Sequence, residues 1–281
     1  LVAFWLTDGT EHEPGWYRHL VQTRAALVAP IFINYAQGML RKQAERPITG
    51  LWAFNTDDGA PQLAKIVLPK LLESFPARAN QAQLRVLNQE LLPAAIRHLE
   101  QADLIRIQHA RLTLKSLDAP QRIAWLVAGL GIEPDHMANE LIQFVGTSQA
   151  RAVQMADTLS NIGTRIASRM HLPAHVWTRL IERLAPHAEP NRPDTSFWVG
   201  PVDERREWVH GMITRLAEST EPGAADALRS LRAQPHLARW RTALDVALAA
   251  HIRSARESSF KHAMAADVVH TLCAKEPANV T

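Results

Sequence analysis

The stretch from Asp118 to Val145 constrains the fold more than any other, because it contains two helical patterns separated by a short connection. Asp118 can cap the first helix, and Gly131 is expected to end it in the left-handed conformation. Its apolar residues recur at i, i+3, i+4 and i+7, which places them on one face: Ile123, Leu126, Val127 and Leu130. Pro134 then opens a second helix with the same apolar spacing at Met137, Leu141, Phe144 and Val145.

Two such helices form an antiparallel pair that cannot stand alone. Helices shorter than about 12 to 15 residues are marginal in water, so each pair has to bury its apolar face against neighbouring pairs. Similar patterns recur along the chain, from Gly15 toward Leu27, from Pro30, from Leu63 to Phe75, from Leu84 to Leu99, from Ser148 to Met170, from Pro173, from Asp203 to Leu216, from Pro222, from Pro235 and from Ala265 to Leu272.

The sequence therefore predicts an all-α fold, an irregular α-solenoid of stacked antiparallel helix pairs. Successive pairs are spaced by roughly 30 to 45 residues, which is typical of HEAT-like repeats. Pro69 and Pro93 fall inside helical patterns and are expected to kink them. We expect residues 1–281 to form a single elongated helical-repeat domain, a piece of a longer protein, with the Pro-rich loop 186–201 as the candidate point of sub-division.

Cysteine content and hydropathy bear on the compartment. A single cysteine, Cys273, excludes an internal disulfide, as in proteins of a reducing compartment. The longest uncharged apolar run, from Ile123 to Ile132, is half of the ~20 residues that a membrane helix needs, and no signal peptide pattern is present. We therefore expect a cytoplasmic protein that does not enter a membrane.

The chain lacks the residue patterns that carry common chemistry. No Gly-Lys-Ser or Gly-Lys-Thr follows a glycine-rich loop, so a Walker-type nucleotide site is not expected. His171 and His175 have a metal-ligand spacing, but Pro173 between them turns the two side chains apart. The acidic pairs Asp57-Asp58 and Asp203-Glu204 fall in loops or at helix starts, where carboxylates favour the helix dipole. The sequence predicts no catalytic, cofactor or metal site.

Most of the eight tryptophans fall on apolar helical faces and are expected in the core. Trp52 is expected to anchor the loop from Arg46 to Pro61 to the core, together with Leu51 and Phe54. Trp240 follows Leu237 by three residues and precedes Leu244 by four, which predicts a buried side chain between the last two helical pairs.

Basic residues exceed acidic ones in the last third of the chain. The segment 205–261 holds ten Lys and Arg against six Asp and Glu. This excess is enough for a weak phosphate-binding face, but an ordinary solvated helical surface has the same composition and is the favoured interpretation. The candidate nucleic-acid or partner surface consists of Arg229, Arg232, Arg239, Arg253 and Arg256.

Three segments resemble the helical, HEAT-like region of large bacterial NACHT-type STAND NTPases. They are residues 122–130, the Phe-Trp-Val-Gly-Pro of 197–201, and residues 227–241 with the downstream Phe260 and Pro277-Ala-Asn. The resemblance implies a nucleotide-switch module upstream, a helical array that senses or relays a signal, and a role in defence against phage. It maps no catalytic residue onto this sequence.

Three functions follow as hypotheses, of which an undetected hydrolase comes last. The first is a non-catalytic sensor or scaffold, whose preformed surface binds a protein ligand or other domains of the parent chain. The second is a nucleic-acid-binding helical scaffold that uses the basic face 205–261. A phosphate-binding loop in sequence upstream of this chain would decide for the first.

Because the phosphate-cradling sequence is missing, we predict that the purified chain neither binds nor hydrolyses ATP. Isothermal titration calorimetry is the test, with phosphate release measured in parallel. Saturable binding at micromolar ATP would contradict the prediction.

Overall fold

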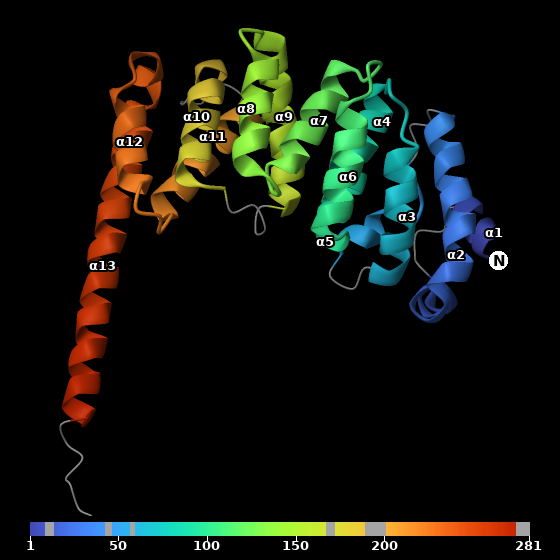
Figure 1. Ribbon diagram of the computed structural model, residues 1–281, viewed down its shortest axis with the longest axis horizontal. Helices are drawn as coiled ribbons and strands as arrows, with labels where there is room; N and C mark the ends of the chain where they lie inside the picture. Colours follow the sequence, from blue (N-terminus) through green and yellow to red (C-terminus); the bar gives the residue numbers. More distant parts are fainter. Residues whose placement is uncertain (9–13, 43–46, 57–59, 167–171, 189–200, 274–281) are drawn as a thin grey trace, which may run out of the picture. The chain divides into compact units, whose positions relative to one another are not determined.

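The fold is all-α, as predicted. A computed structural model describes the chain except for residues 9–13, 43–46, 57–59, 167–171, 189–200 and 274–281, and within the described part every regular element is a helix (Figure 1). The chain divides into two compact units, Leu1–Leu172 and Pro173–Thr281. No described helix is long and apolar enough to cross a bilayer.

The first unit is a series of short helices stacked side by side. They are α1 (Val2–Asp8), α2 (Gly15–Arg41), η1 (Trp52–Asn55), α3 (Pro61–Glu73), α4 (Gln81–Val86), η2 (Leu87–Leu91), α5 (Leu92–His98), α6 (Gln101–Leu112), α7 (Ala119–Gly129), α8 (Pro134–Val145) and α9 (Gln149–Ile166). Helix α2 contacts α1 and α3, and α7 contacts α6, α8 and α9. Each helix thus buries its apolar face against neighbours, as an irregular solenoid requires.

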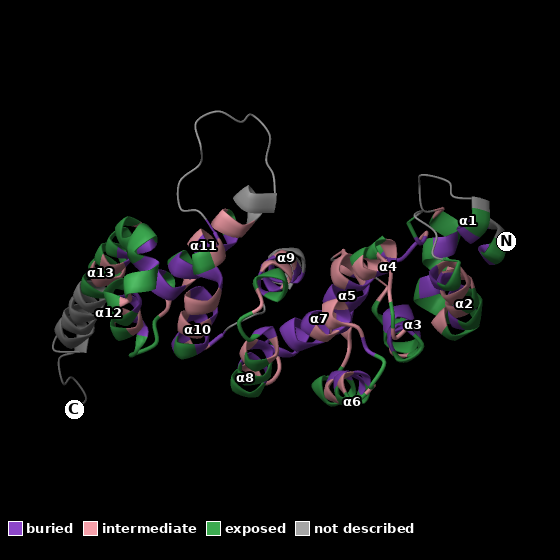
Figure 2. Cartoon of the chain, turned by 90° about the horizontal axis from the view of Figure 1, so that it is seen from above, coloured by how far each residue is buried: buried purple, intermediate pink, exposed green. Residues whose placement is uncertain are grey.

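The predicted helix pair is present as α7 and α8. The carboxylate of Asp118 accepts a hydrogen bond from the backbone N–H of Gln121 at 2.9 Å and caps α7. Every residue from Ile123 to Leu130 is buried, so α7 lies in the core of the first unit (Figure 2). The expectation for Gly131 is wrong: the positive φ after this pair belongs to Gly146, at 51°, where α8 ends.

Prolines act differently from the prediction in two places. The helices expected on either side of Pro30 form one helix, α2, whose kink lies at Arg24 with φ −139° and ψ 41°. The expected kink at Pro93 is replaced by the π-helical turn η2 immediately before it. A π turn shifts the hydrogen-bond register, which accommodates the proline nitrogen that has no hydrogen to donate.

A buried arginine joins three elements of the first unit. Arg111 on α6 donates to the carbonyl of Phe75 at 2.7 Å, to the carbonyl of Pro76 at 3.2 Å and to Gln121 at 3.2 Å. Burial lowers the pKa of Arg111, and the nearby carboxylate of Asp118 opposes that shift. The charged guanidinium therefore satisfies carbonyls that the end of α3 leaves without helical partners.

The second unit contains α10 (Ala174–Leu184), η3 (Ala185–His187), α11 (Pro201–Glu218), α12 (Ala224–Ala233), η4 (Pro235–Trp240) and α13 (Arg241–Cys273). Helix α11 contacts α10, α12 and α13. The separate helix expected from Ala265 to Leu272 is part of α13, because no proline or glycine interrupts the chain between Arg241 and Cys273. Most of the Pro-rich loop 186–201, at which we expect a sub-division, lies outside the described residues.

Tryptophan burial largely follows the prediction. Trp5, Trp125, Trp177, Trp208 and Trp240 are buried, whereas Trp16 and Trp52 are exposed and Trp198 lies outside the described residues. The anchoring expected of Trp52 is wrong: in the 3-10 turn η1 the buried Leu51 and Phe54 share one face, and Trp52 points about a third of a turn away from them. The predicted burial of Trp240 is confirmed: its side chain is 1% exposed, and its Nε1 donates to the carbonyl of Ala185 at 3.0 Å. The ring of His210 packs edge-on against it at 4.9 Å. Trp240 therefore joins η4 to α11 and to the end of α10.

We predict that Trp240→Ala destabilises the second unit by about 3 to 5 kcal/mol, because it leaves a large cavity and an unpaired carbonyl. Hydrogen exchange should show lost protection after Pro173 while protection in α3 and α7 is retained. Trp16→Ala is the control: Trp16 is 43% exposed and lies in the first unit, so its loss should leave protection in α11 to α13 unchanged. Unchanged protection in α11 to α13 of the Trp240 variant would contradict the prediction.

A pH dependence follows from His187 in η3. Burial, together with Arg183 and Arg205, lowers the pKa of His187 below its ordinary value of 6.5. The unfolded chain therefore binds this proton more readily, so the stabilisation is complete above about pH 6.5 and is lost as the pH falls through the folded-state pKa. Urea unfolding of wild type should show this loss, and His187→Gln should reduce it. His236→Gln, at an exposed position, should leave the pH profile unchanged.

Candidate functional site

A groove of about 650 Å³ runs between α11 and α13. Helix α11 contributes His210, Ile213, Thr214, Ala217 and Glu218, and the chain from η4 into α13 contributes Arg239, Thr242, Ala243, Val246, Ala247, Ala250 and Ser254. These positions of α13 recur every three or four residues, so they occupy one face of that helix. The groove is the larger of the two described cavities; the other, of about 470 Å³, lies beside Trp52 in the first unit.

The two walls of the groove run in the same direction. At one end, His210 on α11 contacts Trp240, the residue before α13 begins. Two turns further, a ring nitrogen of His251 on α13 lies 2.8 Å from the carbonyl of Ala217 on α11. From Thr242 to Ser254 the groove extends for about 18 Å at 1.5 Å per helical residue, which is about three turns of helix.

Small side chains keep the groove open. Ala217, Ala243, Ala247 and Ala250 line it, so no described large side chain fills the space between the two helices. Val246 projects from the α13 wall and is 66% exposed, although it is an apolar residue within a long helix. A row of alanines beside an exposed valine is the kind of surface into which the bulky residues of another helix can insert.

Positive charge flanks the exposed valine. Arg239 and Arg253 lie seven residues before and seven residues after Val246, and both are exposed. Among the described residues that line the groove, Glu218 at the end of α11 is the acidic one. Asp245, next to Val246 in the chain, forms an ion pair with Arg232. The surface around Val246 therefore carries both basic and acidic side chains.

The five arginines that the sequence singles out occupy different surroundings. Arg229 pairs with Asp226 at 2.6 Å and Arg232 pairs with Asp245, so acidic side chains already neutralise these two. Arg239 lines the groove, Arg253 lies two turns beyond Val246, and Arg256 is exposed on α13. Of these five arginines, Arg239 is the one among the described residues that line the groove.

Sequence reasoning missed the apolar residues of this groove. The apolar spacing that predicts this helix runs through Leu237, Trp240 and Leu244 and continues to Leu248 and Ile252, and these side chains face the core or its edge. A second stripe, Ala243, Val246, Ala247 and Ala250, lies on an adjacent face at the same helical spacing. Helix α13 packs against both α11 and α12, and the second stripe lies on the wall that lines the groove, so its spacing is the signal that could have identified the groove.

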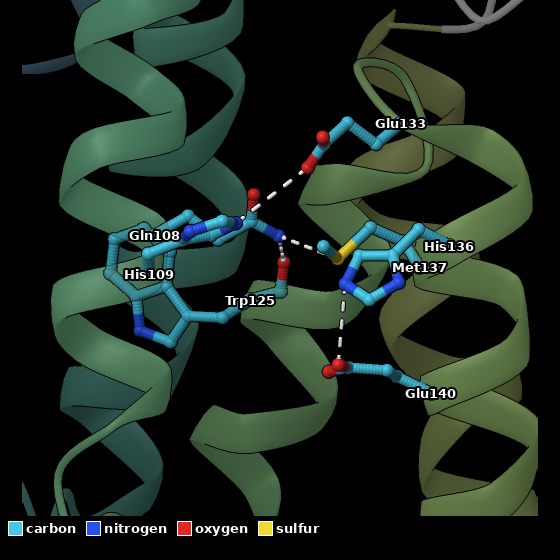
Figure 3. A network of polar contacts seen from close by, with 7 residues as sticks. All are labelled: Gln108, His109, Trp125, Glu133, His136, Met137 and Glu140. Atoms are coloured by element: carbon cyan, nitrogen blue, oxygen red, sulfur yellow. Dashed lines mark hydrogen bonds and ion pairs between the residues drawn. The ribbon is translucent and has the colours of Figure 1, made fainter.

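A second cluster of polar side chains lies between α6, α7 and α8 (Figure 3). The amide of Gln108 is buried and donates to the carbonyl of Trp125 at 2.8 Å and to the sulfur of Met137 at 3.2 Å. Two histidine–carboxylate pairs lie nearby, His109 with Glu133 at 3.6 Å and His136 with Glu140 at 3.3 Å (Figure 3).

This cluster has a structural explanation. Gly129 lies directly against Gln108: a Cβ at residue 129 would come within 2.0 Å of the amide nitrogen. The glycine therefore allows α6 and α7 to approach closely enough for Gln108 to bridge them. The cluster ties α6, α7 and α8 together.

Among the described residues no group of three or more His, Cys, Asp or Glu side chains could hold a metal ion. Three of the candidate residues weighed from the sequence, His171, Asp57 and Asp58, lie outside the described residues. The side chains of Asp203 and Glu204 do so as well. Comparison with family models, with curated proteins and with solved structures yields no match. The resemblance to NACHT-type STAND NTPases therefore rests on the quoted residues alone.

Proposed function

We propose that this chain is a non-catalytic helical scaffold that binds a protein partner, and that the groove between α11 and α13 seats an amphipathic helix with acidic flanks. The observation that carries the proposal is Val246, exposed beside an alanine-lined groove and bracketed by Arg239 and Arg253. An exposed apolar patch with a polar rim marks an interaction site in many proteins.

The dimensions of the groove define the partner. About three turns of helix match its length, and apolar residues at i, i+3 or i+4 and i+7 would reach the alanine floor. Burying a valine-sized side chain contributes roughly 1.5 to 3 kcal/mol. A partner carboxylate two turns before the central apolar residue and a second one two turns after it would meet Arg239 and Arg253. This arrangement favours an acidic partner over a basic one.

In the parent protein we propose that this scaffold is the sensor or relay segment of a bacterial signalling NTPase, with a role in anti-phage defence. The partner is then a protein ligand or another domain of the same chain. This part of the proposal is supported by the resemblance of residues 122–130, 197–201 and 227–241. A phosphate-binding loop in the upstream sequence remains the deciding observation.

The alternative is a nucleic-acid-binding scaffold that uses the basic face 205–261. Three described arginines of this face contact acidic neighbours, Arg206 with Glu207, Arg229 with Asp226 and Arg232 with Asp245. Phosphates would have to compete with these carboxylates. Arg215 packs over the ring of Trp177 at 5.8 Å. No single described feature of the face favours phosphate over a protein carboxylate.

We predict that a synthetic amphipathic peptide of about 15 residues binds the protein when it has leucines at helical spacing and two glutamates, one seven residues before and one seven residues after the central leucine. Fluorescence anisotropy of the labelled peptide gives the Kd. Val246→Ser should weaken binding roughly fivefold to tenfold, and Arg239→Gln combined with Arg253→Gln should weaken it by a similar factor. Val246 is exposed, so its substitution should leave the fold intact.

Two controls separate specific from general binding. Ile66→Ser removes an equally apolar exposed side chain on α3, in the first unit, and should leave the Kd unchanged. A peptide with lysines in place of the two glutamates should bind more weakly than the acidic peptide. Equal binding of both peptides, or equal loss in the Ile66 variant, would contradict the proposal. Binding of a labelled DNA duplex that weakens steeply with salt and with Arg253→Gln would favour the alternative.

A further inference from the structure

Two arginines of the first unit share one aromatic ring. The guanidinium carbon of Arg151 lies 4.5 Å from the centre of the Phe144 ring, and that of Arg122 lies 5.6 Å from the same centre. Arg122 is in the first turn of α7, Phe144 in the last turn of α8 and Arg151 in the first turn of α9. We call these three residues the Arg–Phe–Arg cluster. The groove of the proposed function lies in the other unit, so the cluster is independent of it.

The order of the helices brings the cluster to one edge of the first unit. Helices α6 to α9 alternate in direction, so the connection from α6 to α7 lies at the same edge as the connection from α8 to α9 (Figure 1). Gly146 ends α8 with φ 51°, a conformation that costs glycine little, and α9 begins three residues later. Because this turn is tight, Arg151 reaches back over the ring of Phe144.

A backbone carbonyl holds each guanidinium in addition to the ring. Nη2 of Arg122 donates to the carbonyl of Leu112 at 3.1 Å, and Nη1 of Arg151 donates to the carbonyl of Phe144 at 2.8 Å. These carbonyls lie in the last turns of α6 and α8, where helical partners run out. Capping explains where each arginine lies, but it uses one of the five N–H groups of a guanidinium. Arg122 is half-buried and Arg151 is exposed, so a ligand can reach both.

No carboxylate in the described part of the chain forms an ion pair with either arginine of the cluster. Asp118 lies one turn before Arg122, but its carboxylate accepts from two backbone N–H groups, at 2.7 and 2.9 Å. Glu140 lies one turn before Phe144 and pairs with His136 at 3.3 Å. The two positive charges beside the ring are therefore not neutralised by the neighbouring acidic residues.

We infer that the Arg–Phe–Arg cluster binds the phosphate group of a phosphate monoester. Such a group carries between one and two negative charges at pH 7 and three acceptor oxygens, and guanidinium groups bind phosphate through paired N–H donors. Both guanidiniums lie against one ring, and the screening length at physiological salt is about 8 Å, so a single ion at the cluster interacts with both charges.

The number of charges separates this ligand from other anions. A carboxylate and a phosphodiester each carry one charge, which a single guanidinium matches, whereas a monoester approaches two. The ring and the carbonyls hold the arginines in place before the ligand arrives, so binding costs less side-chain entropy than it would at mobile surface arginines.

The test follows the arginine Nε–H resonances of ¹⁵N-labelled protein during titration with inorganic phosphate, with O-phosphoserine and with acetate. The resonances of Arg122 and Arg151 are assigned by through-bond correlation to the backbone. Phosphate and phosphoserine should shift both resonances in a saturable manner with one common Kd, and acetate should bind at least fivefold more weakly. The resonance of Arg41 should not move, because this exposed arginine lies in the last turn of α2, away from the cluster.

Arg122→Lys and Arg151→Lys retain the charge but lose the paired donors, so each should weaken phosphate binding roughly fivefold. Arg41→Lys is the matched control and should leave the Kd unchanged. Tighter binding of phosphoserine than of inorganic phosphate would identify a phosphorylated protein as the source of the group, and equal binding would identify a small phosphate compound.

The titration of wild-type protein is decisive even where a lysine variant does not fold. Absence of a saturable shift, a shift of Arg41 equal to that of the cluster, or equal affinity for acetate and phosphate would overturn the inference. A DNA duplex that displaces phosphoserine and binds more tightly per phosphate would overturn it in favour of nucleic acid. The calorimetric and peptide-binding results of the proposed function are unaffected by any of these outcomes, since they concern the other unit.

Discussion

Helix ends in this protein are satisfied by side chains that reach over from another helix. Short helices leave many backbone groups without partners, since each end exposes four, and a buried unpaired group costs about 1 to 3 kcal/mol. The donors and their carbonyls are Gln83 with Leu40, Arg111 with Phe75, Arg122 with Leu112, and Trp240 with Ala185. At the start of α10, the carboxylate of Glu221 accepts from the N–H of Ala174 at 2.7 Å.

These contacts make neighbouring helices depend on one another. A helix that supplies the hydrogen-bond partner for the end of another cannot shift without leaving that end unpaired. Within each unit, apolar burial holds the helices together, and the polar contacts at their ends fix how far one helix can slide along the next. Sites such as the cavity beside Trp52 and the groove beside Val246 are therefore formed by backbone that is already held in place.

The sequence predicts the helices well because each is defined by local features. Proline at the first turn, the Asp118 cap and apolar spacing locate α7, α8, α10 and α12 within a residue or two. Side-chain partners across helices leave no local pattern, so neither Arg111 nor Gln108 was expected in the core. The 3-10 turn at Trp52 has a period of three, which an apolar run as short as 51–54 cannot distinguish from a loop.

The groove and the cavity differ in how they could have been found from the sequence. The second apolar stripe of α13 has helical spacing in the sequence, so the position of Val246 in that stripe could have been predicted from the sequence alone. The cavity has no such signal, because its lining comes from α2, from the chain around η1 and from the start of α3, and its shape depends on the positive φ of Gly50.

Exposure of Val246 and Trp52 has a common physical basis. Each lies within two residues of buried neighbours, which are Leu244 and Ala247 for the valine and Leu51 and Phe54 for the tryptophan. The backbone that buries those neighbours leaves Val246 and Trp52 no freedom to rotate inward, so apolar surface of each stays in water unless a ligand covers it. By contrast, an apolar side chain on an ordinary solvated face has no ligand to bind, so a polar residue in its place would not change the binding of any ligand. In this protein the exposed valine adjoins a row of alanines, and the exposed tryptophan adjoins an apolar cavity. Each site therefore combines a fixed apolar side chain with an open apolar space, and this combination favours ligand binding over plain solvent exposure.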